Sequence, residues 1–188
     1  MIVYRTVTRL VRPGPWLAAV RAEARCLAGS GGDHDAIREL LIEVGALEAG
    51  VADALAPDAD LHGPLHEALR AATCAAARAL RASWDGASAP RRRGVLARVV
   101  TALDALAAHA LPAVVSVGVP EGYAYYALYP EAYLEAARCL LQTLAPAHAV
   151  CIGVRTIGTS LAAAVVAGME TGRGTVSHID TSPSPRDE

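Results

Sequence analysis

At Pro112 the hydrophobic pattern of the chain changes. Before this residue, apolar side chains recur at the spacing of amphipathic helices. After it, two short β-branched runs alternate with two helical segments, and this order is typical of parallel strands joined by right-handed crossovers. We therefore predict an α/β protein in which a mainly helical region, 1–111, packs on a small parallel strand–helix–strand–helix unit, 112–170.

Four helices are expected in the first region, separated by turns that contain Gly or Pro. Their expected bounds are 16–27, about 33–55 with Asp33 as the N-cap, 64–84 with Pro64 in the first turn, and 91–110. Phe is absent and aromatic residues make up only 4% of the chain. The core must therefore consist mostly of Ala, Leu and Val, which favours closely packed helices.

The second region is expected to contain two strands, 113–119 and 149–154, and two helices, 130–144 and 159–169. Two parallel strands are too few for a stable sheet. A third strand at 2–7 is one way to complete the sheet. Pairing with another chain is a second way, and the third is that this chain is the front portion of a longer protein. The polar segment 171–188 is predicted to be a disordered tail.

A polar turn at 155–160 follows the second of these strands and precedes a helix of small apolar residues. Backbone N–H groups at such a helix N-terminus, together with the helix dipole, favour an anion. Gly158 would let the backbone approach a ligand, and Arg155 could contact a phosphate through two nitrogens. We therefore predict a phosphate-binding site made of Arg155, Thr156, Gly158, Thr159 and Ser160. The alternative is a capped strand-to-helix turn with a surface arginine.

The strand, the sequence Gly-Val-Arg-Thr-Ile-Gly-Thr-Ser at 153–160 and the Ala-rich helix after it resemble the early part of the type I phosphoribosyltransferase-like fold. In that fold, a loop of this kind helps to hold pyrophosphate. The stretch 119–169 also resembles uncharacterised bacterial proteins with such a domain. The family's strand with paired acidic residues, and the Thr/Gly-rich loop after it, have no match in this chain. The resemblance therefore implies a truncated domain without transferase activity of its own.

Four of the six tyrosines lie in the connection 121–131, after the end of a predicted strand. Ligands of open α/β sheets bind at that edge of the sheet. We predict that a cleft beside the phosphate site is lined by Glu121, Tyr123, Tyr125 and Tyr126. The rings would stack on a base or ribose, and the carboxylate would accept from a hydroxyl. The alternative is aromatic packing of this loop against the helical region.

Charge and composition exclude several classes of partner. The net charge of −2 provides no basic field for nucleic acid, and no apolar run reaches the ~20 residues of a membrane span. The four cysteines form no C-x-x-C pair and are interpreted as small buried thiols of a cytoplasmic protein. His62 and His66 have the spacing of a helical metal pair, but no third ligand is evident, so we expect no metal and no cofactor.

Arg91, Arg92 and Arg93 stand at the start of a predicted helix, where the helix dipole opposes positive charge. The ordinary interpretation is a solvated helix end, and the alternative is contact with phosphate or an acidic partner. No Ser–His–Asp or Cys–His arrangement can be assembled from the spacing, so nucleophilic catalysis is unsupported.

Two functions remain as hypotheses. In the first, the chain is a phosphoribosyltransferase-like protein that binds a phosphate or pyrophosphate group and is incomplete or inactive by itself. In the second, it is a non-enzymatic helical interaction module that binds a protein partner or a second copy of itself.

Overall fold

The computed structural model describes residues 8–118, 123, 127–144, 146, 148–155, 157–170 and, as backbone only, 175–182. It contains six long helices and four strands within these residues. In chain order they are β1 (Thr8–Val11), α1 (Pro13–Ser30), α2 (His34–Leu55), α3 (Pro64–Trp84), α4 (Ala89–Leu106), β2 (Val115–Gly118), α6 (Pro130–Leu144), β3 (His148–Val154), α7 (Ile157–Met169) and β4 (Thr175–Ser182).

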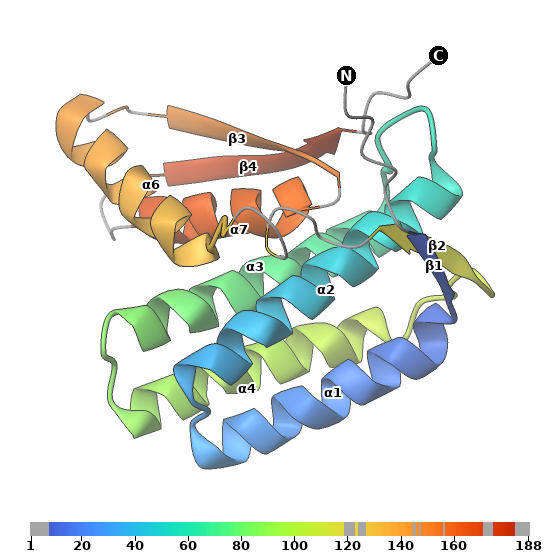
Figure 1. Cartoon of the computed structure of the whole chain (residues 1–188), viewed down its shortest axis with the longest axis horizontal. Helices are drawn as coiled ribbons and strands as arrows, with labels where there is room; N and C mark the ends of the chain where they lie inside the picture. The colour runs from blue at the N-terminus through green and yellow to red at the C-terminus, as the bar shows by residue number, and fades with distance from the viewer. Residues whose placement is uncertain are drawn as a thin grey trace.

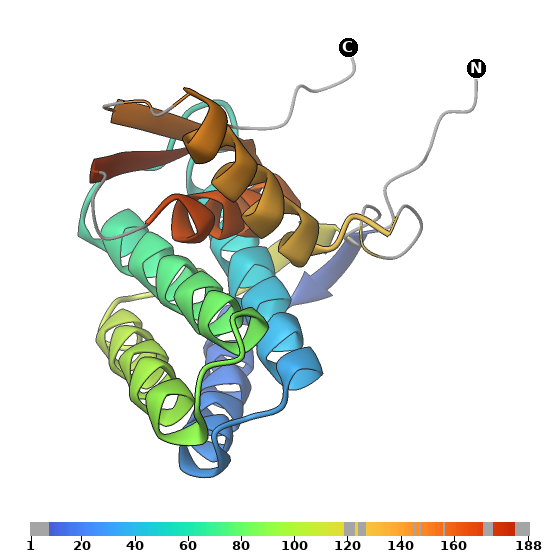
Figure 2. The same cartoon turned by 90° about the vertical axis from the view of Figure 1, so that its left-hand side faces the viewer.

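Helices α1 to α4 pack as a four-helix bundle, called the helical layer below, and α7 lies between the α2–α3 side of this bundle and the pair of strands β3 and β4 (Figure 1). Helix α6 packs beside α7, as the view turned by 90° also shows (Figure 2). The short strands β1 and β2 lie at one end of the helical layer (Figure 1). The chain is thus mostly helical with a small β component, in agreement with the predicted mixed class.

Local signals place the helices near their expected positions, although α1 extends beyond 16–27 at both ends and α4 ends at Leu106 rather than at 110. Asp33 caps α2 by accepting a hydrogen bond of 2.8 Å from the backbone N–H of Ala36. Pro64 and Pro130 each open a helix at its first position, where the missing N–H costs nothing. The interior of the molecule is filled by aliphatic side chains and Ala rather than by aromatic rings, as the composition indicates.

Helix α7 has an almost fully buried surface because it has neighbours on several sides. Its buried residues include the run Leu161–Ala164 and the pair Val166 and Ala167. Glycines allow the neighbours to come close. A Cβ on Gly45 of α2 would lie 2.8 Å from the Cβ of Ser160, and one on Gly168 would lie 2.7 Å from the carbonyl oxygen of Leu134 in α6.

The strand pairing differs from the prediction. Strands β2 and β3 were expected to pair in parallel, but β2 pairs antiparallel with β1, with Thr8 opposite Gly118 and Val11 opposite Val115. Strand β3 pairs in parallel with β4 instead, and α7 is the crossover between them. The reason is that Val115 and Val117 of β2 are buried against α2, which holds this strand on the helical layer.

Two other predictions concern the chain ends. The tail 171–188 was expected to be disordered because of its polar composition, whereas Thr175–Ser182 forms strand β4. The possible strand at 2–7 lies outside the described residues, and β1 begins at Thr8. The parallel unit that the structure contains is therefore β3–α7–β4, one strand further along the chain than predicted.

Substitution of Gly168 tests the close packing of α7. In Gly168→Ala, the new Cβ would be pressed against the Leu134 carbonyl oxygen and the Ala137 side chain. We expect the free energy of unfolding, measured by urea denaturation, to fall by about 2 kcal/mol. Gly29→Ala in α1 is the control, because nothing lies within 4 Å of a Cβ there and no proline follows this residue. Equal stability of the two variants would contradict the packing described.

Candidate functional site

Arg155 follows strand β3, and its side chain is fully buried, with 0% exposure. The guanidinium donates hydrogen bonds from Nη1 to the Asp53 carboxylate at 3.0 Å and to the Ala56 carbonyl at 2.8 Å, and from Nη2 to the Ala59 carbonyl. These acceptors belong to the end of α2 and the loop after it. Arg155 therefore fastens the β3–α7 turn to the helical layer, and it does not present its charge to a ligand.

The neighbouring members of the predicted phosphate site are also engaged within the protein. Gly158 lies against the backbone of Gly153, since a Cβ on Gly153 would be 2.2 Å from the Gly158 carbonyl oxygen. Thr159 and Ser160 are buried in the first turn of α7. Thr156 lies outside the described residues. Of the two alternatives for this turn, the arrangement favours a packed strand-to-helix turn, and its arginine is buried rather than at the surface.

The structure brings Ser160 together with Tyr123, a residue predicted to line the neighbouring cleft. The hydroxyl oxygens of the two residues are 2.6 Å apart, and the Ser160 hydroxyl also lies 3.1 Å from the Ile157 carbonyl oxygen. Burial raises the pKa of Tyr123, so the phenol stays protonated and can donate to Ser160. The other predicted cleft residues, Glu121, Tyr125 and Tyr126, lie outside the described residues.

Tyr123 and Ser160 line a small cleft together with Gly50 and Asp53 of α2 and Val117 of β2. Its volume of about 20 Å³ is enough for about one water molecule. Sites for small organic ligands typically measure about 300–1,000 Å³. A small cleft is thus present at Tyr123 and Ser160, but in this form it has no room for pyrophosphate. The cleft predicted from Glu121, Tyr123, Tyr125 and Tyr126 stays a prediction, since three of these residues are not described.

The structure contains a buried carboxyl group, Glu48, that the sequence analysis did not identify. Glu48 lies in α2 at 1% exposure, and Thr73 of α3 donates a hydrogen bond to its Oε2. Burial raises the pKa of Glu48 to about 7, although the Thr73 hydrogen bond and the charge of Arg70 act in the opposite direction. The signal was present, because Glu48 is four residues after Val44 and three before Val51, on the apolar stripe of the helix.

His34, Ser83 and Glu131 form a second polar cluster that the spacing did not reveal. The Ser83 hydroxyl lies 3.1 Å from Nδ1 of His34, and Oε1 of Glu131 lies 2.9 Å from Nε2. This connectivity is that of a nucleophile, a base and an orienting acid. However, Ser83 lies in the last turn of α3, where the helix dipole disfavours a developing negative charge. We interpret the cluster as a tie between α2, α3 and α6.

The remaining candidates give no metal centre. The rings of His62 and His66 meet edge to face at 6.3 Å between centroids. In the part of the chain that the structure describes, no group of three or more His, Cys, Asp or Glu side chains is arranged to hold a metal ion. Cys26 and Cys139 are exposed, so the expectation of buried thiols is wrong for these two, which lie on the outer faces of α1 and α6.

Among the described residues, no helix is both long enough and apolar enough to cross a membrane. Comparison of the chain with family models, with curated proteins and with solved structures found no match. The resemblance to phosphoribosyltransferase-like proteins therefore stays a prediction from the sequence.

Replacement of Arg155 distinguishes an internal fastening from a ligand contact. Arg155→Ala leaves the Asp53 carboxylate and two carbonyl groups without their donor. We expect the free energy of unfolding to fall by about 3 kcal/mol in urea denaturation. Arg93→Ala, at an exposed position of α4, should change it by less than about 0.5 kcal/mol. If the stability of Arg155→Ala were unchanged, the buried contacts would not be structural, and phosphate binding by Arg155 would again be the better hypothesis.

Glu48 makes stability depend on pH. The unfolded chain releases the Glu48 proton near pH 4.5 and the folded chain near pH 7, so the folded state binds more protons between these values. The free energy of unfolding should therefore fall as the pH rises through this range, by about 3 kcal/mol for this group.

Glu48→Gln removes this contribution while its amide oxygen can still accept from Thr73. The difference in stability between the variant and the wild type should grow in favour of the variant from pH 4.5 to pH 8. Thermal unfolding at a series of pH values measures the difference. Parallel stability curves for the two proteins would show that Glu48 titrates normally.

Proposed function

We propose that this chain is a non-enzymatic interaction module that binds a second copy of itself through strand β3. The observation that carries the proposal is a row of exposed apolar side chains on this strand. Val150 and Ile152 are each 64% exposed, and Val154 is 48% exposed. Side chains of this type are usually among the most buried in a protein.

The row lies on the face of the strand opposite to α7. Alternate residues of a strand point to opposite faces. Cys151 and Gly153 face α7, because the Cys151 thiol lies 3.6 Å from the Ala162 carbonyl oxygen and Gly153 lies against Gly158. Val150, Ile152 and Val154 therefore form one apolar surface, and no described element covers it.

The free edge of β3 supports the same proposal. Among the described residues, β3 pairs only with β4, so its other edge has unpaired backbone groups. Edge strands of natural proteins usually carry charged residues or Pro, which prevent pairing with another chain. Strand β3, His-Ala-Val-Cys-Ile-Gly-Val, contains no Pro, Lys, Arg, Asp or Glu. Nothing in its sequence therefore opposes addition of a further strand.

A second copy is the occupant that best fits this edge. Two β3 strands that pair antiparallel about a twofold axis would give a four-stranded sheet in the order β4–β3–β3–β4. The same three side chains from each copy would then form one continuous apolar face, as an isologous interface requires. A sheet of four strands also relieves the instability of a two-stranded one.

The other function expected from the sequence, phosphate or pyrophosphate binding at 155–160, has less support. Arg155 is engaged with Asp53, and the cleft at Ser160 holds about one water molecule. That function remains a hypothesis which rests on the sequence pattern of the turn and on the resemblance.

The oligomeric state tests the proposal. Light scattering after size-exclusion chromatography, at about 100 µM protein, should give the mass of a dimer for the wild type. Ile152→Lys places a charge in the centre of the apolar row and should give a monomer. Leu10→Lys is the matched control, because Leu10 is 78% exposed on strand β1 of the other sheet.

A monomeric wild type at this concentration would overturn the proposal. So would a dimer that Leu10→Lys disrupts and Ile152→Lys leaves intact, because the interface would then involve β1. Circular dichroism of each variant checks that the helical layer is folded, so that loss of the dimer reports on the interface.

A further inference from the structure

A large cleft lies between α3, α4 and the end of α7, away from strand β3. Its volume is about 620 Å³, within the range of sites for small organic ligands. Four arginines line it, Arg78 and Arg81 from α3 and Arg91 and Arg98 from α4. The carboxylates in its lining are Asp85 and Glu170.

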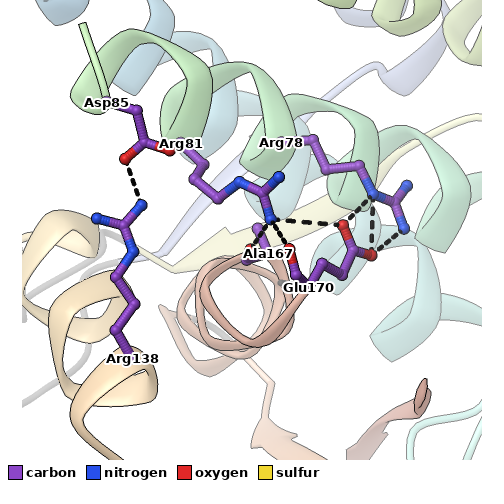
Figure 3. Close-up of polar contacts among 6 residues, drawn as sticks. All are labelled: Arg78, Arg81, Asp85, Arg138, Ala167 and Glu170. Atoms are coloured by element: carbon purple, nitrogen blue, oxygen red, sulfur yellow. Dashed lines mark hydrogen bonds and ion pairs between the residues drawn. The ribbon is translucent and has the colours of Figure 1, made fainter. Parts of the chain in front are cut away.

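Both carboxylates are already neutralised by arginines, as Figure 3 shows. Glu170 binds Arg78 through three hydrogen bonds of 2.6–3.0 Å. Asp85 binds Arg138, which reaches it from α6 and is not part of the lining. Arg81 also lies 4.0 Å from the Glu170 carboxylate, so Arg78 and Arg81 share this group. The charges of Arg91 and Arg98 are therefore not cancelled by the carboxylates of the lining.

Arg81 is held in place by the C-terminal end of α7. Its Nη1 donates to the carbonyl oxygens of Ala167 and Glu170, the second at 2.6 Å (Figure 3). A cation at this position also complements the helix dipole of α7. Two of the four arginines, Arg78 and Arg81, thus have a fixed position before any ligand binds.

Arg91 and Arg98 are available for a ligand. Both are exposed, and neither side chain forms a hydrogen bond or an ion pair within the part of the chain that the structure describes. They are seven residues apart on α4, which places them on one face about 10 Å apart. Gly94 lies between them, and nothing stands within 4 Å of its missing Cβ.

The rest of the lining is small and apolar. Ala75 and Ala82 of α3 and Val95 of α4 contribute to it. Such a surface suits the carbon skeleton of a ligand, while guanidinium groups suit its phosphate groups through paired N–H donors. The net charge of the whole chain is −2, so this local excess of positive charge is not a general property of the surface.

We propose that this cleft binds a small phosphorylated molecule, with Arg91 and Arg98 as the residues that contact its phosphate groups. The proposal does not depend on dimer formation through β3. It also differs from the site predicted at 155–160, because none of the residues predicted there lines this cleft.

Titration of the full chain with inorganic pyrophosphate at low ionic strength tests the proposal. Isothermal calorimetry should give a dissociation constant on the order of 0.1 mM for the wild type. Arg91→Gln and Arg98→Gln should each weaken binding by about 10-fold, since each removes charge-assisted hydrogen bonds. Both side chains are exposed and form no hydrogen bond or ion pair within the described residues, so the variants should fold as the wild type does.

Arg93→Gln is the matched control, because Arg93 is an exposed arginine of the same helix outside the cleft. It should leave the affinity within about twofold of the wild type. In amide NMR spectra, pyrophosphate should shift the signals of Gly94 and Val95 and leave that of Gly158 unchanged.

Four outcomes would overturn the proposal. The first is no binding at about 10 mM pyrophosphate, far above the expected dissociation constant. The second is equal weakening by Arg93→Gln and Arg91→Gln, which would indicate a response to total charge. The third is tighter binding of citrate than of pyrophosphate, which would assign a carboxylate ligand. The fourth is tighter binding of a glutamate hexapeptide, which would assign an acidic protein segment.

Discussion

The close contact of α7 with its neighbours is the constraint on which the rest of the structure depends. It is possible because side chains are absent or small at the contact points. Gly45 meets Ser160, Gly153 meets Gly158 and Gly168 meets the Leu134 backbone, each at a distance that excludes a Cβ. Helix α7 thereby contacts α2, α3, α6 and β3 at once and joins the helical layer to the β3–β4 pair.

This position also decides the role of the turn that precedes α7. The N-terminal turn of the helix is pressed against α2, so Thr159 and Ser160 are buried in the protein. Arg155 is drawn into the same interface and meets the acceptors at the end of α2. A strand, a polar turn and an Ala-rich helix have the same local pattern in an anion site and in a packed crossover. The element packed against the turn, here α2, determines whether an anion site or a packed crossover forms.

The helices could be predicted because their signals are local. Prolines at 64 and 130, the cap at Asp33 and the apolar spacing set their positions without reference to the rest of the fold. The strand pairing could not be predicted in this way, since the partner of a strand depends on contacts far along the chain. Strand β2 has Val115 and Val117 buried against α2. Strand β3 pairs with β4, which lies in a polar segment with the composition of a disordered tail.

Candidate site residues could likewise be predicted where the signal is local, and could not where the contact joins residues far apart in the sequence. Tyr123 and Ser160 were expected to be neighbours at one edge of a parallel sheet. They do meet, but β2 and β3 lie in different sheets, so the reason for the expectation was wrong. Glu48 could have been identified from its place on an apolar stripe, whereas the contacts of Glu131 with His34 join residues 97 positions apart.

The arginines at 91–93 show why a run of charge in the sequence does not define a site. Helical geometry turns successive residues about 100° apart, so the three side chains leave α4 in different directions. Arg92 donates to the Gly31 and Ala87 carbonyl groups, and Arg93 lies beside Gly31 at the end of α1. Only Arg91 enters the cleft, where it is joined by Arg98 from the same face and by Arg78 and Arg81 from α3. The concentration of positive charge therefore arises from packing between two helices. Of the carboxylates in the lining, Asp85 is paired with Arg138 outside the cleft and Glu170 with Arg78 and Arg81, so neither cancels the charge of Arg91 and Arg98.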